Sequence, residues 1–148
     1  MKFHFWHTTL SVFFLLLLAL AIEWLAVMGR LAAFVPVGDF LLMTLAIMRL
    51  VRLTTYDNIT AFVREWFDGY DPESFRGALG TLINCPWCTG LWYALIVVFF
   101  YFATPYAWYV ILILALSAAA SFLQILVNAV GWTAELRKKE ANTPILPR

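Results

Sequence analysis

Four long apolar stretches follow one another along this chain, and they constrain its fold more than any other feature. Each is close to the length of about 20 residues that a helix needs to cross the hydrocarbon core of a bilayer. The intervals between them are too short for a separate soluble domain. The sequence therefore predicts an all-α integral membrane protein with four transmembrane helices, which cover about residues 9–28, 34–53, 86–103 and 105–132.

The composition and charge of the chain exclude other classes of protein. Of its 148 residues, 64% are hydrophobic and 13% are charged, whereas soluble domains average about half apolar and about a quarter charged. Ten Lys and Arg residues nearly balance nine Asp and Glu residues, so the chain lacks the basic excess of nucleic-acid-binding proteins. We expect the lipid bilayer, and no nucleic acid, as its surroundings.

Two of the predicted helices have informative ends. Lys2, an apolar core and the small residues Ala19 and Ala21 are also typical of a cleaved signal peptide, but we expect this stretch to remain as the first transmembrane helix. The dipeptide Thr104-Pro105 must form the turn between the last two stretches, because proline cannot continue a helix and disfavours helix in the residue before it. We expect these two helices to form a hairpin.

The basic residues predict the orientation of the four helices. Only Arg30 falls on one predicted side, and the positive-inside rule assigns the other side to the cytoplasm. Both termini of a bacterial inner-membrane protein would then be cytoplasmic, with residues 1–134 forming the transmembrane domain and 135–148 a basic tail. The residues on the predicted cytoplasmic side are Lys2, Arg49, Arg52, Arg64, Arg76, Arg137, Lys138, Lys139 and Arg148.

The connection between the second and third stretches contains a predicted amphipathic helix over residues 58–68. It would begin after Asp57 or Asn58 as N-cap and stop at Gly69. Such a helix lies in the membrane interface, docks onto a partner or covers the bundle as a lid. Its apolar stripe comprises Ile59, Phe62, Val63, Trp66 and Phe67, and Arg64, Glu65 and Asp68 lie off that stripe.

Two polar groups fall within or beside the predicted transmembrane helices. Arg49 and Arg52 lie near the inner end of the second helix, and we expect an Arg–Asp anchor with Asp57 rather than a lipid-phosphate or partner site. The fourth helix carries a polar stripe, which in lipid usually bonds to another helix and less often lines a water or ion path. The stripe consists of Ser117, Ser121, Gln124 and Asn128.

Cys85 and Cys88 are the two cysteines of the chain, and they precede and begin the third apolar stretch. Cys85 is placed to be the N-cap and Pro86 the first helical residue, where the positive end of the helix lowers a thiol pKa. The pair fits a redox site, half of a zinc site or simple packing. Zinc needs four ligands, which His4 and His7 or a second subunit would complete. We expect packing, with Cys88 among Trp87, Trp92 and a neighbouring helix.

Two strings of residues resemble a known family. They are Arg49-Leu50-Val51-Arg52-Leu53-Thr54-Thr55-Tyr56-Asp57-Asn58-Ile59-Thr60-Ala61-Phe62-Val63-Arg64 and Cys85-Pro86-Trp87-Cys88-Thr89-Gly90-Leu91-Trp92. The chain resembles, over about residues 43–115, the small bacterial and phage membrane proteins grouped as domain of unknown function 1360. The resemblance implies that both strings belong to one shared core, and it implies no activity.

No phosphate-binding loop, catalytic triad or paired carboxylates are present in the sequence. The leading hypothesis is a non-enzymatic membrane subunit or adaptor without cofactor, which presents a cytoplasmic face to another membrane protein or forms a homo-oligomer. Its interaction or structural core would include Arg49, Arg52, Asp57, Arg64, Trp66 and Trp92. The alternative is a thiol-dependent membrane oxidoreductase or a metal-dependent regulator that uses Cys85 and Cys88.

Overall fold

The computed structural model describes residues 2–32, 34–71 and 73–142, with side chains for 5–32, 34–71 and 73–139. Helices joined by short turns make up this part of the chain, and it contains no strand, as the apolar stretches predict. The elements in chain order are α1 (Lys2–Val27), α2 (Val37–Thr55), the 3₁₀ helix η1 (Asn58–Thr60), α3 (Ala61–Phe67), α4 (Phe75–Asn84), α5 (Pro86–Ala103) and α6 (Ala107–Asn142).

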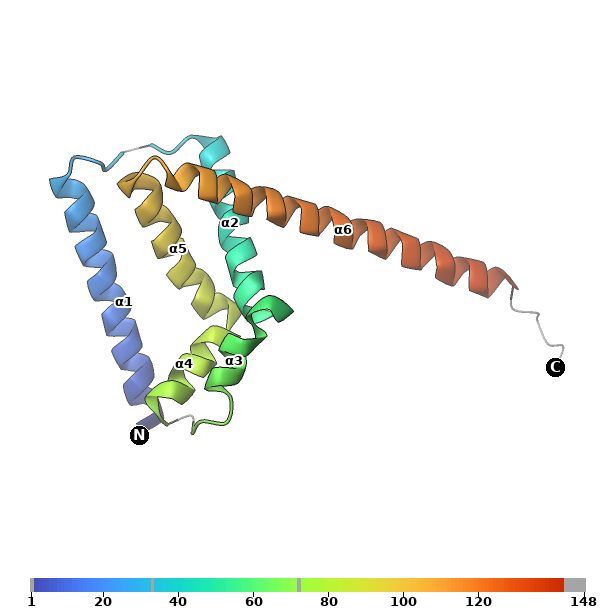
Figure 1. Cartoon of the computed structure of the whole chain (residues 1–148), viewed down its shortest axis with the longest axis horizontal. Helices are drawn as coiled ribbons and strands as arrows, with labels where there is room; N and C mark the ends of the chain where they lie inside the picture. Colours follow the sequence, from blue (N-terminus) through green and yellow to red (C-terminus); the bar gives the residue numbers. More distant parts are fainter. Residues whose placement is uncertain (1, 33, 72, 143–148) are drawn as a thin grey trace.

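The helices α1, α5 and α2 extend between two ends of the molecule (Figure 1). One end, which we call the α3–α4 end, holds α3, α4 and the start of α1, where the rings of Trp6 and Phe75 lie 5.3 Å apart. At the other, the Arg30 end, Arg30 donates hydrogen bonds to the carbonyls of Phe102 and Ala103 at the end of α5. The α3–α4 end therefore gathers the whole connection between α2 and α5.

The small core lies where α2 meets α5 and α6. Met43 and Ala46 of α2 pack with Val97 of α5 and Ile111 of α6, and all four are buried. α6 makes its main contacts with α2 and few with α5. The hairpin prediction is therefore wrong: the turn falls at Thr104-Pro105 as expected, but α6 leaves it at a steep angle to α5 and crosses α2 (Figure 1).

Within the described part of the chain, three helices, not four, are long and apolar enough to cross a membrane: Phe5–Val27, Pro86–Ala103 and Ala107–Lys139. The predicted second transmembrane helix forms as α2, with 19 residues, but it carries Asp39, Arg49 and Arg52. These three charges within 19 residues distinguish it from the other three helices, whose most apolar stretches of similar length carry fewer. The prediction of four membrane crossings is therefore wrong, and the cytoplasmic location of both termini, which assumed four, stays a prediction.

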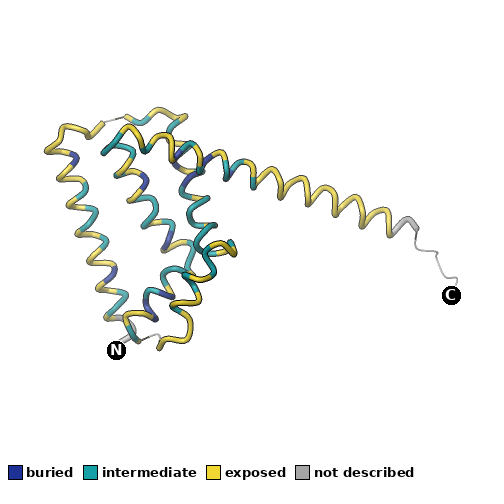
Figure 2. Tube along the Cα trace, in the orientation of Figure 1, coloured by how far each residue is buried: buried dark blue, intermediate teal, exposed yellow. Residues whose placement is uncertain are grey.

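The second half of α6 stands apart from the other helices. Every described residue from Phe122 to Lys139 is exposed, as the yellow half of α6 shows (Figure 2). The helix continues without a break past the predicted boundary between residues 134 and 135, as far as Asn142. The division of the chain at that boundary stays a prediction.

The predicted amphipathic helix is present as two elements. Asn58–Thr60 form a 3₁₀ turn and Ala61–Phe67 an α-helix, which ends before Gly69 with its φ of 81°. Asp57 occupies the N-cap position but makes no capping hydrogen bond with its side chain. Whether the helix lies in a membrane interface stays a prediction.

The sequence analysis missed α4. Its N-cap, Ser74, accepts a hydrogen bond from the Gly77 backbone N–H at 3.0 Å. Gly77 and Gly80 lower its helix propensity, yet both are buried. A Cβ on Gly80 would lie 3.2 Å from the carbonyl oxygen of Phe67 and 3.3 Å from its Cβ. The glycine therefore allows α4 to approach the end of α3.

We expect Gly80→Ala to destabilise the α3–α4 end by about 1 kcal/mol or more, since overpacking outweighs the gain in helix propensity. Gly38→Ala is the matched control, because Gly38 is also helical and a Cβ added there would have no neighbour within 4 Å. Thermal unfolding of the detergent-solubilised protein measures both variants. An equal or higher Tm for Gly80→Ala would contradict the close approach.

Candidate functional site

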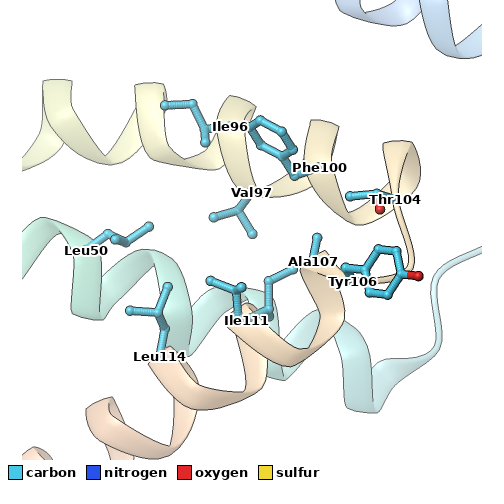
Figure 3. Close-up of a pocket in the computed structure, with 10 residues that line it drawn as sticks. Leu50, Ile96, Val97, Phe100, Thr104, Tyr106, Ala107, Ile111 and Leu114 are labelled. Atoms are coloured by element: carbon cyan, nitrogen blue, oxygen red, sulfur yellow. The ribbon is translucent and has the colours of Figure 1, made fainter.

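An apolar groove between α5 and α6 offers no chemistry. It encloses about 380 Å³ between α5 and α6, with Leu50 of α2 on a third side (Figure 3). The hydroxyls of Thr104 and Tyr106 are the only polar side-chain groups of its lining, so it suits an acyl chain better than a polar substrate. The other lining residues are Ile96, Val97, Phe100, Ala107, Val110, Ile111 and Leu114.

Charged side chains meet instead at the α3–α4 end, where α2 turns into η1. Arg49 Nη1 lies 3.0 Å from Asp57 Oδ2, and Arg52 Nε lies 4.0 Å from Asp57 Oδ1. The ion pair between Arg49 and Asp57 confirms the predicted Arg–Asp anchor. The Arg49 side chain is only 18% exposed and that of Arg52 is 48% exposed, so Arg52 is the more available of the two for an outside anion.

Arg64 binds the end of α2 through backbone carbonyls and not through the Asp57 carboxylate. Its Nη1 donates to the carbonyls of Thr54 at 2.9 Å and Asp57 at 3.0 Å, and to the Thr60 hydroxyl oxygen at 3.2 Å. Thr60 itself donates to the carbonyl of Leu53. The last carbonyls of a helix have no partner within the helix, so Arg64 and Thr60 fix α3 to the end of α2. The cluster holds three guanidinium groups and one carboxylate, which pairs with Arg49 and Arg52, so the cluster is positively charged.

The apolar stripe of the η1–α3 segment divides into an inner and an outer half. Val63 and Phe67 are half-buried. Ile59, Phe62 and Trp66 are 73%, 67% and 71% exposed. We call these last three residues the aromatic face. Glu65 and Asp68 are exposed as well, as expected for residues off the stripe.

The cysteine pair lies at the start of α5. Cys85 is the N-cap, Pro86 is the first helical residue, and the Cys88 N–H donates to Cys85 Sγ at 3.4 Å, which confirms the predicted cap. Hydrogen bonds from the Cys88 thiol and backbone N–H lower the pKa of the Cys85 thiol. Both cysteines are free, and Cys88 is exposed.

The predicted packing of Cys88 among tryptophans is wrong. Trp87 is almost fully exposed. Trp92 lies on the side of α5 that meets α1, with its ring 5.2 Å from that of Phe14 and 6.1 Å from that of Phe13. Residues 87, 88 and 92 therefore do not form one packed group. Cys88 and Trp92 lie one turn apart on the same side of α5, but Cys88 is exposed, and Trp87 points in another direction.

Thr89 is a site residue that the sequence analysis missed. It is buried, and its hydroxyl donates to the carbonyls of Leu82 at 2.7 Å and Cys85 at 2.9 Å. Thr55 of α2 donates to the neighbouring Ile83 carbonyl at 3.4 Å. Two hydroxyls thus bond to the C-terminal end of α4 and join it to α2 and α5. The one sequence signal was a threonine four residues after an N-cap.

A polar cavity of about 500 Å³ opens beside Cys85. It lies between the α3–α4 connection and the α4–α5 junction, and three glycines contribute to its wall. Cys85, whose thiol has a lowered pKa, is part of its lining. Its lining residues are Phe67, Asp68, Gly69, Tyr70, Gly77, Gly80, Thr81, Asn84 and Cys85.

The residues described do not fit a metal centre. Among them, no group of three or more His, Cys, Asp and Glu side chains could hold an ion. His7 belongs to α1, and the His4 side chain lies outside the part that the structure describes. We therefore derive no chemistry from zinc.

The predicted polar stripe of α6 forms bonds within its own helix. Ser121 Oγ donates to the Ser117 carbonyl at 2.8 Å, and Gln124 Nε2 donates to Asn128 Oδ1 at 3.1 Å. Gln124 and Asn128 are exposed, and both serines are half-buried. The stripe therefore does not bond to another helix of this chain within the described residues.

A second missed cluster lies at the Arg30 end. Tyr101 Oη donates to Asp39 Oδ2 at 2.6 Å, and Trp108 Nε1 donates to Asp39 Oδ1 at 3.3 Å. The carboxylate of α2 thus joins the end of α5 to the start of α6. Its partners explain how α2 keeps this charge beside apolar helices.

Comparison with known proteins identifies the family. Residues 69–127 match the family described as Protein of unknown function (DUF1360). Sporulation protein YjcA of Bacillus subtilis (strain 168) is 31% identical over 104 residues, which cover 59% of this chain and 88% of that relative. The chain belongs to the DUF1360 family. UPF0713 protein YngL of the same organism is 34% identical over 104 residues, covering 62% of this chain and 78% of the relative.

The DUF1360 match begins and ends later than the resemblance implied. It contains Cys85, Cys88, Thr89 and Trp92 but not the string from Arg49 to Arg64. The matched residues therefore comprise α4, α5 and the first part of α6, with the turns between them. No solved structure matches the chain.

We expect Thr89→Val to destabilise the junction of α4 and α5 by about 1–3 kcal/mol, because the Leu82 carbonyl loses its short hydrogen bond in a buried place. Thr89→Ser keeps the hydroxyl and is the matched control. Thermal unfolding in detergent compares the two variants. If both lose the same stability, the lost methyl group and not the hydrogen bond is responsible.

The lowered pKa of Cys85 predicts a pH profile. A lowered pKa means that the reactive thiolate is present at pH values where an ordinary cysteine is still protonated. The rate of Cys85 alkylation, followed by mass spectrometry, should therefore rise at lower pH than that of a free cysteine. Cys88→Ala should move the profile to higher pH, whereas Cys88→Ser, whose hydroxyl can still donate, should move it less. Identical profiles for wild type and Cys88→Ala would contradict the role of Cys88.

Proposed function

We propose that this DUF1360 protein is a non-enzymatic membrane adaptor, which binds another membrane protein through the α3–α4 end. The aromatic face is the observation that carries this proposal. Ile59, Phe62 and Trp66 expose two thirds or more of their surface, although the segment that holds them is fixed in place. Exposed aromatic residues on a fixed support are typical of protein interfaces.

The support for the aromatic face comes from the charged cluster behind it. Arg64 bonds to the end of α2, and Arg49 pairs with Asp57. A partner therefore meets a preorganised surface and does not have to order it. The exposed Arg52 adds positive charge nearby, which suits a partner segment with acidic residues.

The membrane in this proposal is the bacterial cytoplasmic membrane, with the α3–α4 end toward the cytoplasm. Two observations support it. The relatives come from a bacterium, and the α3–α4 end of the molecule holds Arg49, Arg52, Arg64 and Arg76. The name of YjcA associates that relative with sporulation. We include a role in sporulation in the proposal for this chain.

A thiol-dependent function is the second candidate. The lowered pKa of Cys85 favours it, together with the polar cavity beside that thiol. A redox role requires that Cys85 and Cys88 form a disulfide and are reduced again by a thiol donor. Mass spectrometry after mild oxidation and reduction tests this, and a pair that never forms a disulfide would exclude it.

Photo-crosslinking tests the adaptor proposal directly. The photoreactive residue benzoylphenylalanine is placed at position 62 or 66 of the full chain in host membranes, and at position 65 as control. Glu65 is exposed on the same short helix but lies off the aromatic face. We expect one protein adduct at 62 and 66 that is absent at 65 and is lost on Ile59→Asp. Adducts to lipid alone, or equal adducts at 65, would contradict an adaptor role.

A further inference from the structure

We propose that α6 pairs with α6 of a second copy of this chain, through a seam that begins at Ser117 and ends at Glu135. The proposal goes beyond the adaptor function and does not depend on it, because it concerns a different helix. The seam residues follow one another at alternating intervals of four and three. They are Ser117, Ser121, Gln124, Asn128, Gly131 and Glu135.

The seam is separate from the side of α6 that packs within the chain. Ile111, Ala115 and Ala118 are buried in the contact region with α2. At about 100° per residue, the seam lies roughly a third of a turn away from that side. Beyond Ser121 the helix has left the other helices, and all its described residues are exposed (Figure 2). A second helix can therefore reach the seam without displacing α2.

Lipid covers most of the exposed half of α6 but cannot satisfy the seam. Phe122, Leu123 and Leu126 are apolar and need no partner in a bilayer. Gln124 and Asn128 each carry an amide with two donors and a carbonyl acceptor. Their mutual hydrogen bond of 3.1 Å uses one donor and one acceptor. Within the described residues, no other side chain bonds to the remaining groups.

The positions of the two amides place them in the hydrocarbon. Trp108 and Trp132 lie near the two ends of the apolar part of α6, where aromatic residues mark the membrane interfaces. Gln124 lies about 6 Å and Asn128 about 12 Å beyond the midpoint between them, at a rise of about 1.5 Å per residue. Half the hydrocarbon thickness is about 15 Å. These distances run along the helix axis, and a tilt of α6 only makes the corresponding depths smaller, so both amides lie in the hydrocarbon. Polar groups there are stabilised by bonding to a neighbouring helix.

A second copy fits the seam because the seam is self-complementary. An amide both donates and accepts, so two identical amide faces can bond to each other. Copies inserted in the same orientation present parallel α6 helices, so each seam residue meets its counterpart. The alternation of four and three residues is the pattern of left-handed helix pairs that cross at about 20°. Ser117, Ser121 and Gly131 are small enough for close approach.

Sedimentation equilibrium of the full chain in density-matched micelles tests the pairing. Gln124→Leu with Asn128→Leu removes the amides but keeps an apolar helix of similar volume, so insertion and folding are preserved. We expect the dimer of this double variant to be weakened about tenfold. Leu126→Ala with Val130→Ala is the control on the opposite side of α6, and it should leave the dimer unchanged within about twofold.

Cross-linking in native membranes provides an independent test. In a Cys85→Ser, Cys88→Ser background, single cysteines replace Ser121 or Asn128 on the seam, or Leu126 or Val130 off it. Copper phenanthroline with oxygen joins two nearby thiols, the two electrons and two protons passing to oxygen. We expect a product of twice the chain mass at the seam positions only. A monomer in both assays, equal cross-linking at all four positions, or a product of another mass would overturn the proposal.

Discussion

A polar group that is packed away from water must find its partner within the protein, and the arrangement of this chain depends on that constraint. α2 shows it most clearly, since it carries a charge near each end. Asp39 receives hydrogen bonds from Tyr101 and Trp108, and Arg49 pairs with Asp57. The same helix supplies Met43 and Ala46 to the core. Binding the Asp39 carboxylate and burying the apolar side of α2 therefore require the same two helices, α5 and α6.

The ends of the helices obey the same constraint. Arg30 bonds to the last carbonyls of α5, Arg64 to the end of α2, and Thr89 to the end of α4. Each bond comes from an element other than the helix that it caps. These side chains therefore satisfy backbone groups and at the same time set which helix ends meet. The aromatic face and the cysteine pair both lie at the end where two of these three bonds occur.

Features that depend on neighbouring residues could be predicted from the sequence. Cys85 followed by Pro86 predicted the start of α5, because capping involves residues within one turn. The pair of Arg49 and Asp57 was also predictable, since only one short turn separates them. Asp39 and its partners were missed, because the partners follow it by 62 and 69 positions in the sequence. The direction of α6 was missed as well, since it follows from packing against α2 and not from the turn.

The exposure of side chains was the hardest feature to predict at the candidate site. The apolar residues from Ile59 to Phe67 recur at the spacing of a single helix face, but only the structure shows that the outer half of this stripe is exposed. The glycines of α4 argued against a helix on propensity alone. Their reason, the close approach of Gly80 to Phe67, appears only when both helices are in place.

The contacts of α1 bear on how the chain is assembled during synthesis. α1 packs against α4 and α5, and its aromatic partners include Phe75, Trp92 and Phe99. The ribosome makes these residues after those of α1. α1 must therefore be stable in the bilayer as a single helix until α5 has been inserted. Its apolar residues are not confined to one side, which makes a single helix stable in lipid.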